Sequence, residues 1–366
     1  MITVFLFLML LIYAVFIALL IYGFSKVKNY ESTCLLPKTK FTIIVPFRNE
    51  AENLPKLLDS FSKLNYPTEL FEVLLVDDDS EEEFIVKDLK FAILLIKNIR
   101  VSNSPKKDAI STAMQFVKTD WIVTTDADCV VKENWLLTLD NYIQNHEVYM
   151  IAGAVTYDCE NSFLHHFQQL DLASLQGATI GSFGIGKGFM CNGANFAYTK
   201  SLFEKLNGFD GNNKIASGDD VFLLQKAIAR FPEEVHYLKS ENNIVLTKPV
   251  NNWKSLFYQR VRWASKTGSY QSGFGIGLGL VVFGGNIGLL FVVCCLLFGK
   301  GNEYLLIFFL FMKFLVDAVL IYKANRFLTK NRLHYLVLSS LLYPFFSVSV
   351  AFYSLFGKYE WKGRKF

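Results

Sequence analysis

The sequence lacks the cysteine and histidine patterns that build metal centres or disulfide frameworks. Its 366 residues include six cysteines and five histidines, and no two cysteines form a C-x-x-C pair. This argues against zinc-ribbon folds and disulfide-stapled secreted domains, and it fits a reducing cytoplasm. His165 and His166 are adjacent, but no third ligand is spaced to join them, so we interpret them as packing residues. The net charge of +4 is modest, and we expect no nucleic-acid partner.

Charge is almost absent from four long segments. Residues 2–24 are nearly all apolar and are long enough to cross a bilayer. They have neither a basic leading segment nor a small-residue cleavage site, so we expect a retained membrane anchor at 1–25 and not a signal peptide. Within 273–357, the segments 275–298, 304–322 and 335–356 predict three further transmembrane helices.

The distribution of basic residues orients these helices. The loop 323–334 carries four cationic side chains, which places it in the cytoplasm, and counting back places residues 26–250 there too. Counting forward puts the basic tail 358–366 outside, against the same rule. Two explanations stay open: Pro344 breaks the last span, or so short a tail simply translocates.

The central part alternates strand and helix patterns. This alternation predicts an α/β fold with a mostly parallel, Rossmann-like sheet. We expect strands at 41–45, 72–76, 92–96, 99–101 and 121–125, helices at 50–63, 81–90 and 107–117, and a mobile glycine-rich loop at 177–188.

Acidic residues follow two of these strands. Asp126 and Asp128 come directly after the strand 121–125, and Asp77 and Asp78 follow the strand 72–76. Parallel strands end at one edge of a sheet, so we expect the two clusters to share a crevice. A D-x-D pair suits Mg²⁺ or Mn²⁺, which bind a few carboxylates and take further oxygens from substrate phosphates. The alternative for Asp77–Asp79 is a turn and an N-cap for the next helix.

Four further features follow in order along the chain. They are a small-residue turn at 192–195, the acidic pair Asp219-Asp220 after Gly218, the helical run 221–225, and the segment 259–263 with Gln259, Arg262 and Trp263. Trp253, Leu256, Phe257, Val261 and Ala264 form an apolar stripe at helical spacing, so we expect an interfacial amphipathic helix at 251–272.

In this order and at these separations, the motifs resemble those of membrane-bound family 2 glycosyltransferases, whose catalytic domain has a GT-A fold. The matching segments are 45–50 (VPFRNE), 76–80 (VDDDS), 105–110 (PKKDAI), the D-x-D, 218–220 (GDD) and 259–263 (QRVRW). Asp79 stands where the family usually has glycine. The layout of one anchor and three C-terminal helices looks like that of ceramide glucosyltransferase and its bacterial relatives.

The resemblance implies a nucleotide-sugar donor, with a UDP-sugar favoured, held by a metal at Asp126 and Asp128. It also implies a set of donor-binding residues: Pro46, Asn49, Glu50, Asp77, Asp78, Lys107 (with Lys106 second) and Asp126. The metal, Mg²⁺ or Mn²⁺, would neutralise the diphosphate leaving group.

For the acceptor side, the resemblance implies Asp220 as the catalytic base in an inverting displacement. Burial is expected to raise the pKa of such a carboxylate toward the working range. Asp219, Gln259, Arg262 and Trp263 would contact the acceptor or the diphosphate. The alternatives are a helix N-cap for the acidic pair and a membrane-interface anchor for Arg262 and Trp263.

Because the Gln259–Trp263 segment lies close to the second span, we expect a membrane lipid or lipid-linked acceptor. A polysaccharide synthase is the alternative, although such enzymes usually have more spans. Two other classes fit less well. An inactive membrane scaffold would have lost Asp126, Asp128 and Asp220, and a nucleotidyl transferase would carry an early glycine-rich phosphate loop, whereas 45–50 and 76–80 contain no glycine.

Overall fold

The central part of the chain is built on one mixed sheet. The computed structural model describes residues 2–32, 35–86, 89–212, 215, 217–299, 302–330, 332–357, 360–361 and 364–365. The sheet has seven strands in the order β3-β2-β1-β4-β7-β5-β8. Their bounds are β1 Phe41–Phe47, β2 Phe71–Asp77, β3 Ala92–Lys97, β4 Trp121–Thr124, β5 Met150–Gly153, β7 Phe196–Thr199 and β8 Val235–Leu238. Only β7 runs antiparallel to its neighbours, so the predicted mostly parallel sheet is confirmed.

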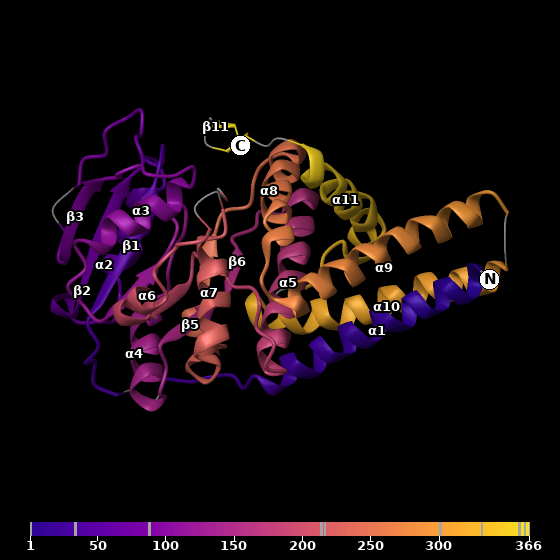
Figure 1. Cartoon of the computed structure of the whole chain (residues 1–366), viewed down its shortest axis with the longest axis horizontal. Helices are drawn as coiled ribbons and strands as arrows, with labels where there is room; N and C mark the ends of the chain where they lie inside the picture. Colours follow the sequence, from indigo (N-terminus) through magenta and orange to yellow (C-terminus); the bar gives the residue numbers. More distant parts are fainter. Residues whose placement is uncertain are drawn as a thin grey trace.

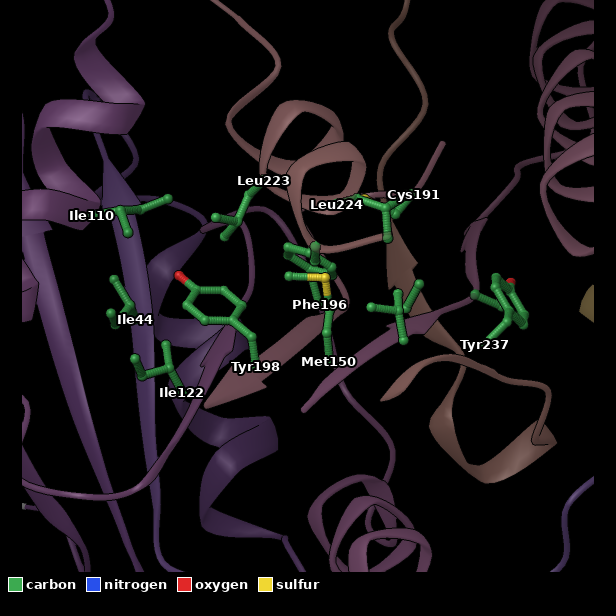
Figure 2. Packing of buried hydrophobic residues seen from close by; sticks show 14 of the residues in the cluster. Ile44, Ile110, Ile122, Met150, Cys191, Phe196, Tyr198, Leu223, Leu224 and Tyr237 are labelled. Carbon is green, nitrogen blue, oxygen red and sulfur yellow. The ribbon is translucent and has the colours of Figure 1, made fainter. Parts of the chain in front are cut away.

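Alternate residues of the strands face two separate helical layers, as the period of a strand requires. On one face, Ile43 and Val73 pack with α2 (Leu54–Ser62) and α4 (Trp135–Asn145). On the other, Ile44 and Ile122 pack with α3 (Pro105–Met114), α6 (Lys200–Lys205) and α7 (Asp219–Arg230). Figure 2 shows this second layer, where side chains of β4, β5 and β7 meet those of α7. Apart from the partly exposed edge strand β3, the sheet is therefore buried on both faces, which fixes the positions of its strand ends.

Four described helices are long and apolar enough to cross a membrane. They are α1 (Ile2–Lys26), α9 (Gly273–Leu297), α10 (Glu303–Leu328) and α11 (Leu336–Phe356). In Figure 1, α1, α9 and α10 run together away from the sheet, whereas α11 lies beside α8 (Trp253–Ser265). A small second sheet pairs β6 (Val155–Tyr157) with β9 (Val245–Thr247), and a hairpin pairs β10 (Glu360–Trp361) with β11 (Arg364–Lys365).

Residues 177–184 of the glycine-rich segment form the end of a helix and not the expected loop, whereas 185–188 lie beyond it. Helix α5 runs from Phe163 to Gly184 and packs along α1 and α10. A Cβ on Gly181 would lie 2.4 Å from the carbonyl oxygen of Leu20, and one on Gly184 would lie 1.9 Å from that of Gly23. The glycines therefore let two backbones touch, a use of small residues that is common where membrane helices cross.

Two shorter predictions are also wrong. The described part of the expected helix 81–90 is irregular, and residues 87–88 lie outside the described residues. The expected strand 99–101 is likewise irregular. In both places side chains take the backbone donors: Asn49 Oδ1 accepts from the Glu81 amide at 2.9 Å, and Asp108 Oδ2 accepts from the Val101 amide at 3.2 Å. Such local bonds compete with regular structure.

Two charged side chains of the apolar helix α10 form an ion pair. Lys313 Nζ lies 2.8 Å from Asp317 Oδ2, one helical turn further along α10. The hydroxyl of Tyr13 donates to the other oxygen of Asp317 and so ties α1 to α10. This network satisfies two charges inside the helical bundle, where unpaired ions are costly.

Candidate active site

A cavity of about 1310 Å³ lies where the sheet, α5, α7, α8 and α11 meet. Part of its wall is formed by the ends of β1, β2 and β4 and the segments that follow them, because the register of these parallel strands brings their carboxyl ends to one edge. The predicted site residues that line it are Pro46, Glu50, Asp78, Asp126, Asp128, Asp219, Asp220, Gln259, Arg262 and Trp263. Residues spread over more than 200 positions of the sequence thus meet in one place, as the motif order predicted.

At the centre of the cavity, one lysine joins the acidic clusters. Lys106, in the first turn of α3, places its Nζ 2.6 Å from Asp126 Oδ1 and 3.6 Å from Asp219 Oδ2. Burial disfavours its charge, but Asp126, Asp219 and Asp220 together raise the pKa of Lys106 above its ordinary value. The ammonium is therefore a permanent cation beside the D-x-D pair.

Asp220 is held by the turn at 192–195. The Gly193 amide donates to Asp220 Oδ2 at 2.8 Å, and the Val221 amide donates to Oδ1 at 2.7 Å. A Cβ on Gly193 would lie 3.1 Å from Lys106 Nζ, so glycine suits this close approach of backbone to side chains. Lys266 Nζ lies 3.6 Å from Asp220 Oδ1. The carboxylate thus accepts hydrogen bonds from the first turn of α7 and from the turn at 192–195, and it forms an ion pair with Lys266.

The pKa values of the two acidic neighbours move apart. Burial would raise the pKa of Asp220, but Lys266, Lys106 and the two amide donors lower it below the ordinary 3.8. The expectation of a raised pKa at Asp220 is therefore wrong, because cations and hydrogen bonds outweigh burial. Burial, together with the negative charges of Asp220 and Asp126, instead raises the pKa of Asp219. The pair contains one firmly ionised carboxylate and one that holds a proton more readily.

The two carboxylates of the D-x-D pair suit a divalent cation that also binds substrate oxygens. Asp126 and Asp128 both line the cavity. Among the described residues, no group of three or more His, Cys, Asp or Glu side chains is arranged to hold a metal ion. Two carboxylates alone do not complete an octahedral shell, so phosphate oxygens and water would have to supply the remaining ligands.

Asp78, which follows β2, is a nearly buried acidic group in the cavity lining. Asn98 Nδ2 donates to Asp78 Oδ1 at 2.7 Å, and Arg100 Nη1 lies 3.4 Å from the same oxygen. Asp77 has a different role, because its Oδ1 accepts from the amide and hydroxyl of Ser80 at 3.0 and 2.6 Å. Of this predicted pair, only Asp78 lines the cavity.

Asn49 and Lys107 also lie outside the cavity lining, contrary to expectation. The Asn49 amide donates to Ser80 Oγ at 2.9 Å, so Asn49 joins the loops after β1 and β2. Lys107 Nζ is buried and donates to the carbonyls of Asn212 and Ile215 at 2.7 and 2.9 Å. Burial lowers the pKa of Lys107 to about 8. The cavity lysine of this helix is Lys106, because adjacent helical residues point in directions about 100° apart.

Helix α8 brings its motif to the cavity through a buried ion pair. Arg260 Nε lies 2.5 Å from Asp171 Oδ2 on α5, and both side chains are almost fully buried. The Arg260 guanidinium also stacks over the ring of Trp263, 4.2 Å from its centroid. The pair fixes the rotation of α8, so that Gln259, Arg262 and Trp263 line the cavity.

Helices α5 and α11 contribute apolar side chains to the lining, Leu172 and Leu175 from α5 and Tyr343, Phe346 and Val350 from α11. The buried Asp171–Arg260 pair lies among them. Val261 of α8, which belongs to the predicted apolar stripe, is fully buried against Val350. That stripe therefore packs on protein over part of its length. Sequence reasoning did not place α11 at the site, although its residues 343, 346, 347 and 350 recur at helical spacing.

Residues 42–207 match the family model described as "Glycosyl transferase family 2". Among curated relatives, the chain is 25% identical over 243 residues to the probable glycosyltransferase YdaM of Bacillus subtilis, covering 62% of this chain and 54% of that one. It is 23% identical over 193 residues to the glycosyltransferase AglE of Haloferax volcanii, covering 51% and 60%. The chain thus spans little more than half the length of these relatives.

Among solved structures, the chain is similar to the mannosyltransferase PcManGT of Pyrobaculum calidifontis, a structure with GDP-Man and Mn²⁺. The TM-score is 0.59 at 15% identity, over 91% of this chain and 100% of that one. This likeness shows the fold alone, and it confirms the expected GT-A-like architecture with its apolar helices.

Proposed function

The chain carries a family 2 glycosyltransferase domain, and from this premise we propose that it moves a sugar from a nucleotide-sugar donor to a hydroxyl of a membrane lipid or lipid-linked acceptor. The observation that carries the proposal is the cavity itself. Asp78, Asp126, Asp128 and Lys106 line one part of it, which we take as the donor end, whereas α5 and α11 together contribute more apolar than polar side chains to its lining. An amphiphilic acceptor would match this change of polarity.

On the donor side, Pro46, Glu50 and Asp78 would contact the nucleoside, and Lys106 would lie beside the diphosphate. A divalent cation bound at Asp126 and Asp128 would neutralise charge on the leaving diphosphate. Lys106 and Arg262 would contribute fixed positive charge to the same group, and a guanidinium can contact phosphate oxygens bidentately. The Mn²⁺ and GDP-Man held by PcManGT are compatible with these assignments.

On the acceptor side, Asp220 would accept the proton of the attacking hydroxyl. The hydroxyl oxygen would bond to the anomeric carbon while the bond to the diphosphate breaks and its electron pair leaves with the diphosphate. This single in-line displacement inverts the anomeric configuration. The low pKa of Asp220 keeps the carboxylate ready to accept a proton, and the two backbone amides hold it in place. Gln259 and Trp263 would orient the acceptor.

The test is to incubate membranes that contain the protein with labelled UDP-sugars and GDP-sugars, and to follow label into lipid extract, into polymer and into free sugar. We expect label in the lipid extract, loss of transfer when a chelator is added, and recovery with Mg²⁺ or Mn²⁺. Label in polymer alone would instead favour a polysaccharide synthase. Neither transfer nor donor hydrolysis with any donor would refute the enzyme assignment.

The role of Asp220 has its own test. Asp220→Asn should lower kcat by about 10²- to 10⁴-fold, the usual contribution of a general base. The matched control is Asp210→Asn, which changes an exposed carboxyl outside the cavity and should leave kcat unchanged. Full transfer by Asp220→Asn would remove Asp220 as the base.

A further inference from the structure

The chain contacts the catalytic domain both before and after helix α11. Just before it, Lys330 Nζ lies 2.6 Å from Glu241 Oε2, in the short helix after β8. The ring of His334 also lies 4.8 Å, centroid to centroid, from that of His166 on α5. After the helix, Arg364 of β11 forms an ion pair with Asp78 at the donor end of the cavity. Both flanking segments therefore lie on one side of any membrane that the protein spans.

The length of α11 shows why flanking segments on one side of the membrane argue against a crossing. The 21 residues of α11 extend over about 31 Å, close to the thickness of a bilayer's hydrocarbon core. Had α11 crossed, the eight residues that follow Phe356, up to Arg364, would have to recross the bilayer as an extended chain reaching at most about 29 Å. Its backbone groups and charged side chains would then lie in hydrocarbon without partners, which is not a viable spanning structure.

The two faces of α11 fit a helix that lies along the membrane boundary. One face, with Tyr343, Phe346 and Val350, lines the cavity. The other exposes large apolar side chains: Val337, Leu338, Leu341, Phe345, Phe352 and Leu355. In Figure 1, α11 lies beside α8, and the C-terminus lies near the catalytic domain, whereas the N-terminus is at the far end of the helical bundle.

We propose that α11 does not cross the membrane but covers the cavity from its membrane side, and that the chain returns beyond it so that Arg364 positions Asp78 for donor binding. The second part rests on the proposed function, because it takes Asp78 to be a donor contact. With three crossings, by α1, α9 and α10, the basic tail lies on the side of the catalytic domain. The conflict between helix count and tail charge is thereby removed.

Arg364 acts through Asp78. Its Nη1 contacts Asp78 Oδ2, and its Nη2 lies 3.3 Å from the main-chain oxygen of the same residue. Among the residues that line the described cavity, Asp78 is present and Arg364 is not. Asn98 donates to the other carboxylate oxygen and Arg100 to both, and together with them Arg364 fixes the orientation of a nearly buried acid. It is therefore a positioning residue, contributed by the last part of the chain to a site formed near its beginning.

The topology is tested without reference to activity. In a full-length chain with its native cysteines replaced, Lys365→Cys is probed with a membrane-impermeant maleimide in intact cells and in inverted vesicles. Lys63→Cys reports the catalytic domain, and Glu303→Cys reports the connection between α9 and α10. We expect Lys365→Cys to label in the same preparation as Lys63→Cys. Labelling together with Glu303→Cys would show that α11 crosses and would overturn the proposal.

The positioning role is tested by kinetics with the donor that supports transfer. Arg364→Ala should raise the donor KM by about three- to tenfold with kcat unchanged, a loss typical of one coupled contact. Arg364→Lys should restore part of it. Combined with Asp78→Ala, Arg364→Ala should cause no further rise. Arg230→Ala, a surface arginine on α7, is the matched control. An unchanged or lowered donor KM in Arg364→Ala would refute the positioning role.

The two failures are separable. If no nucleotide sugar supports transfer, the proposed function fails, while the labelling experiment still decides where α11 and the tail lie. If transfer occurs and Arg364→Ala behaves as wild type, the glycosyltransferase assignment stands and only the role of Arg364 is lost.

Discussion

Replacing Asp171 by asparagine should destabilise the protein far more than the same change at Asp59. Both carboxylates pair with a cation at nearly equal distance, 2.5 Å for Asp171–Arg260 and 2.6 Å for Asp59–Lys63. Their surroundings differ: the side chains of the first pair are 4% and 6% exposed, and those of the second are both 62% exposed. The comparison therefore isolates burial as the variable.

Breaking a buried pair leaves an uncompensated charge in a poorly solvated place. Asp171→Asn, which strands the Arg260 cation, should cost about 3–5 kcal/mol of unfolding free energy. Asp59→Asn should cost at most about 1 kcal/mol, because water and salt screen an exposed pair. At about 2 °C per kcal/mol for a chain of this size, the first change should lower Tm by about 6–10 °C and the second by less than about 2 °C.

The assay is thermal unfolding of the purified protein in detergent, followed by tryptophan fluorescence and by loss of the monodisperse species. Replacing both charges, with Asp171→Leu and Arg260→Met together, should recover a large part of the loss because no unpaired ion remains. If Asp171→Asn costs no more than Asp59→Asn, the buried pair does not hold α8 against α5.

Three further outcomes follow from the site and the helix crossing. Gly181→Leu should lower Tm by several degrees, because a side chain there meets the backbone of α1. Gly277→Ala should not lower Tm, because no atom lies within 4 Å of the added Cβ. Equal effects of the two changes would contradict close packing where α5 crosses α1. With Asp220 as the base, kcat/KM should stay on its plateau down to about pH 5, because a carboxyl whose pKa lies below 3.8 is almost fully ionised there. An acid limb near pH 6 would assign the base elsewhere. Lys106→Met should raise the KM for the nucleotide sugar by tenfold or more with the fold intact. Lys107→Met should mainly lower Tm, because two carbonyls lose the ammonium that donates hydrogen bonds to them. The reverse pattern in nucleotide-sugar titration and thermal unfolding would restore Lys107 as the cavity lysine.

Patterns with a strict period were read correctly from the sequence. The buried strands ending near Asp77 and Asp126 are present, and parallel pairing explains why their acidic residues approach one edge. The helix that carries Arg262 is also where its apolar stripe predicted it. These features depend on local spacing, which a single sequence contains.

Features that depend on distant partners were missed. The glycines of α5 suggest a loop until α1 is known to lie against them, because a glycine gives the same local signal in a turn and in a helix crossing. Asp220 was expected to have a raised pKa because its spacing in the sequence does not reveal Lys266, which follows α8, 46 residues further along the chain, and places its Nζ 3.6 Å from Asp220 Oδ1. Whether Lys106 or Lys107 faces the cavity depends on the rotation of the short helix α3, which packing against α7 and its neighbours sets.

The order in which the walls of the cavity occur along the chain has a consequence for biosynthesis. The cavity contains Pro46, from the first strand, and Ala351, near the end of the last long helix. A nascent chain therefore exposes its acidic cluster long before the apolar wall that faces it has been made. Under the proposed topology, α11 can close the cavity only after α9 and α10 have been inserted. Transfer activity would then begin only in molecules whose membrane insertion is complete.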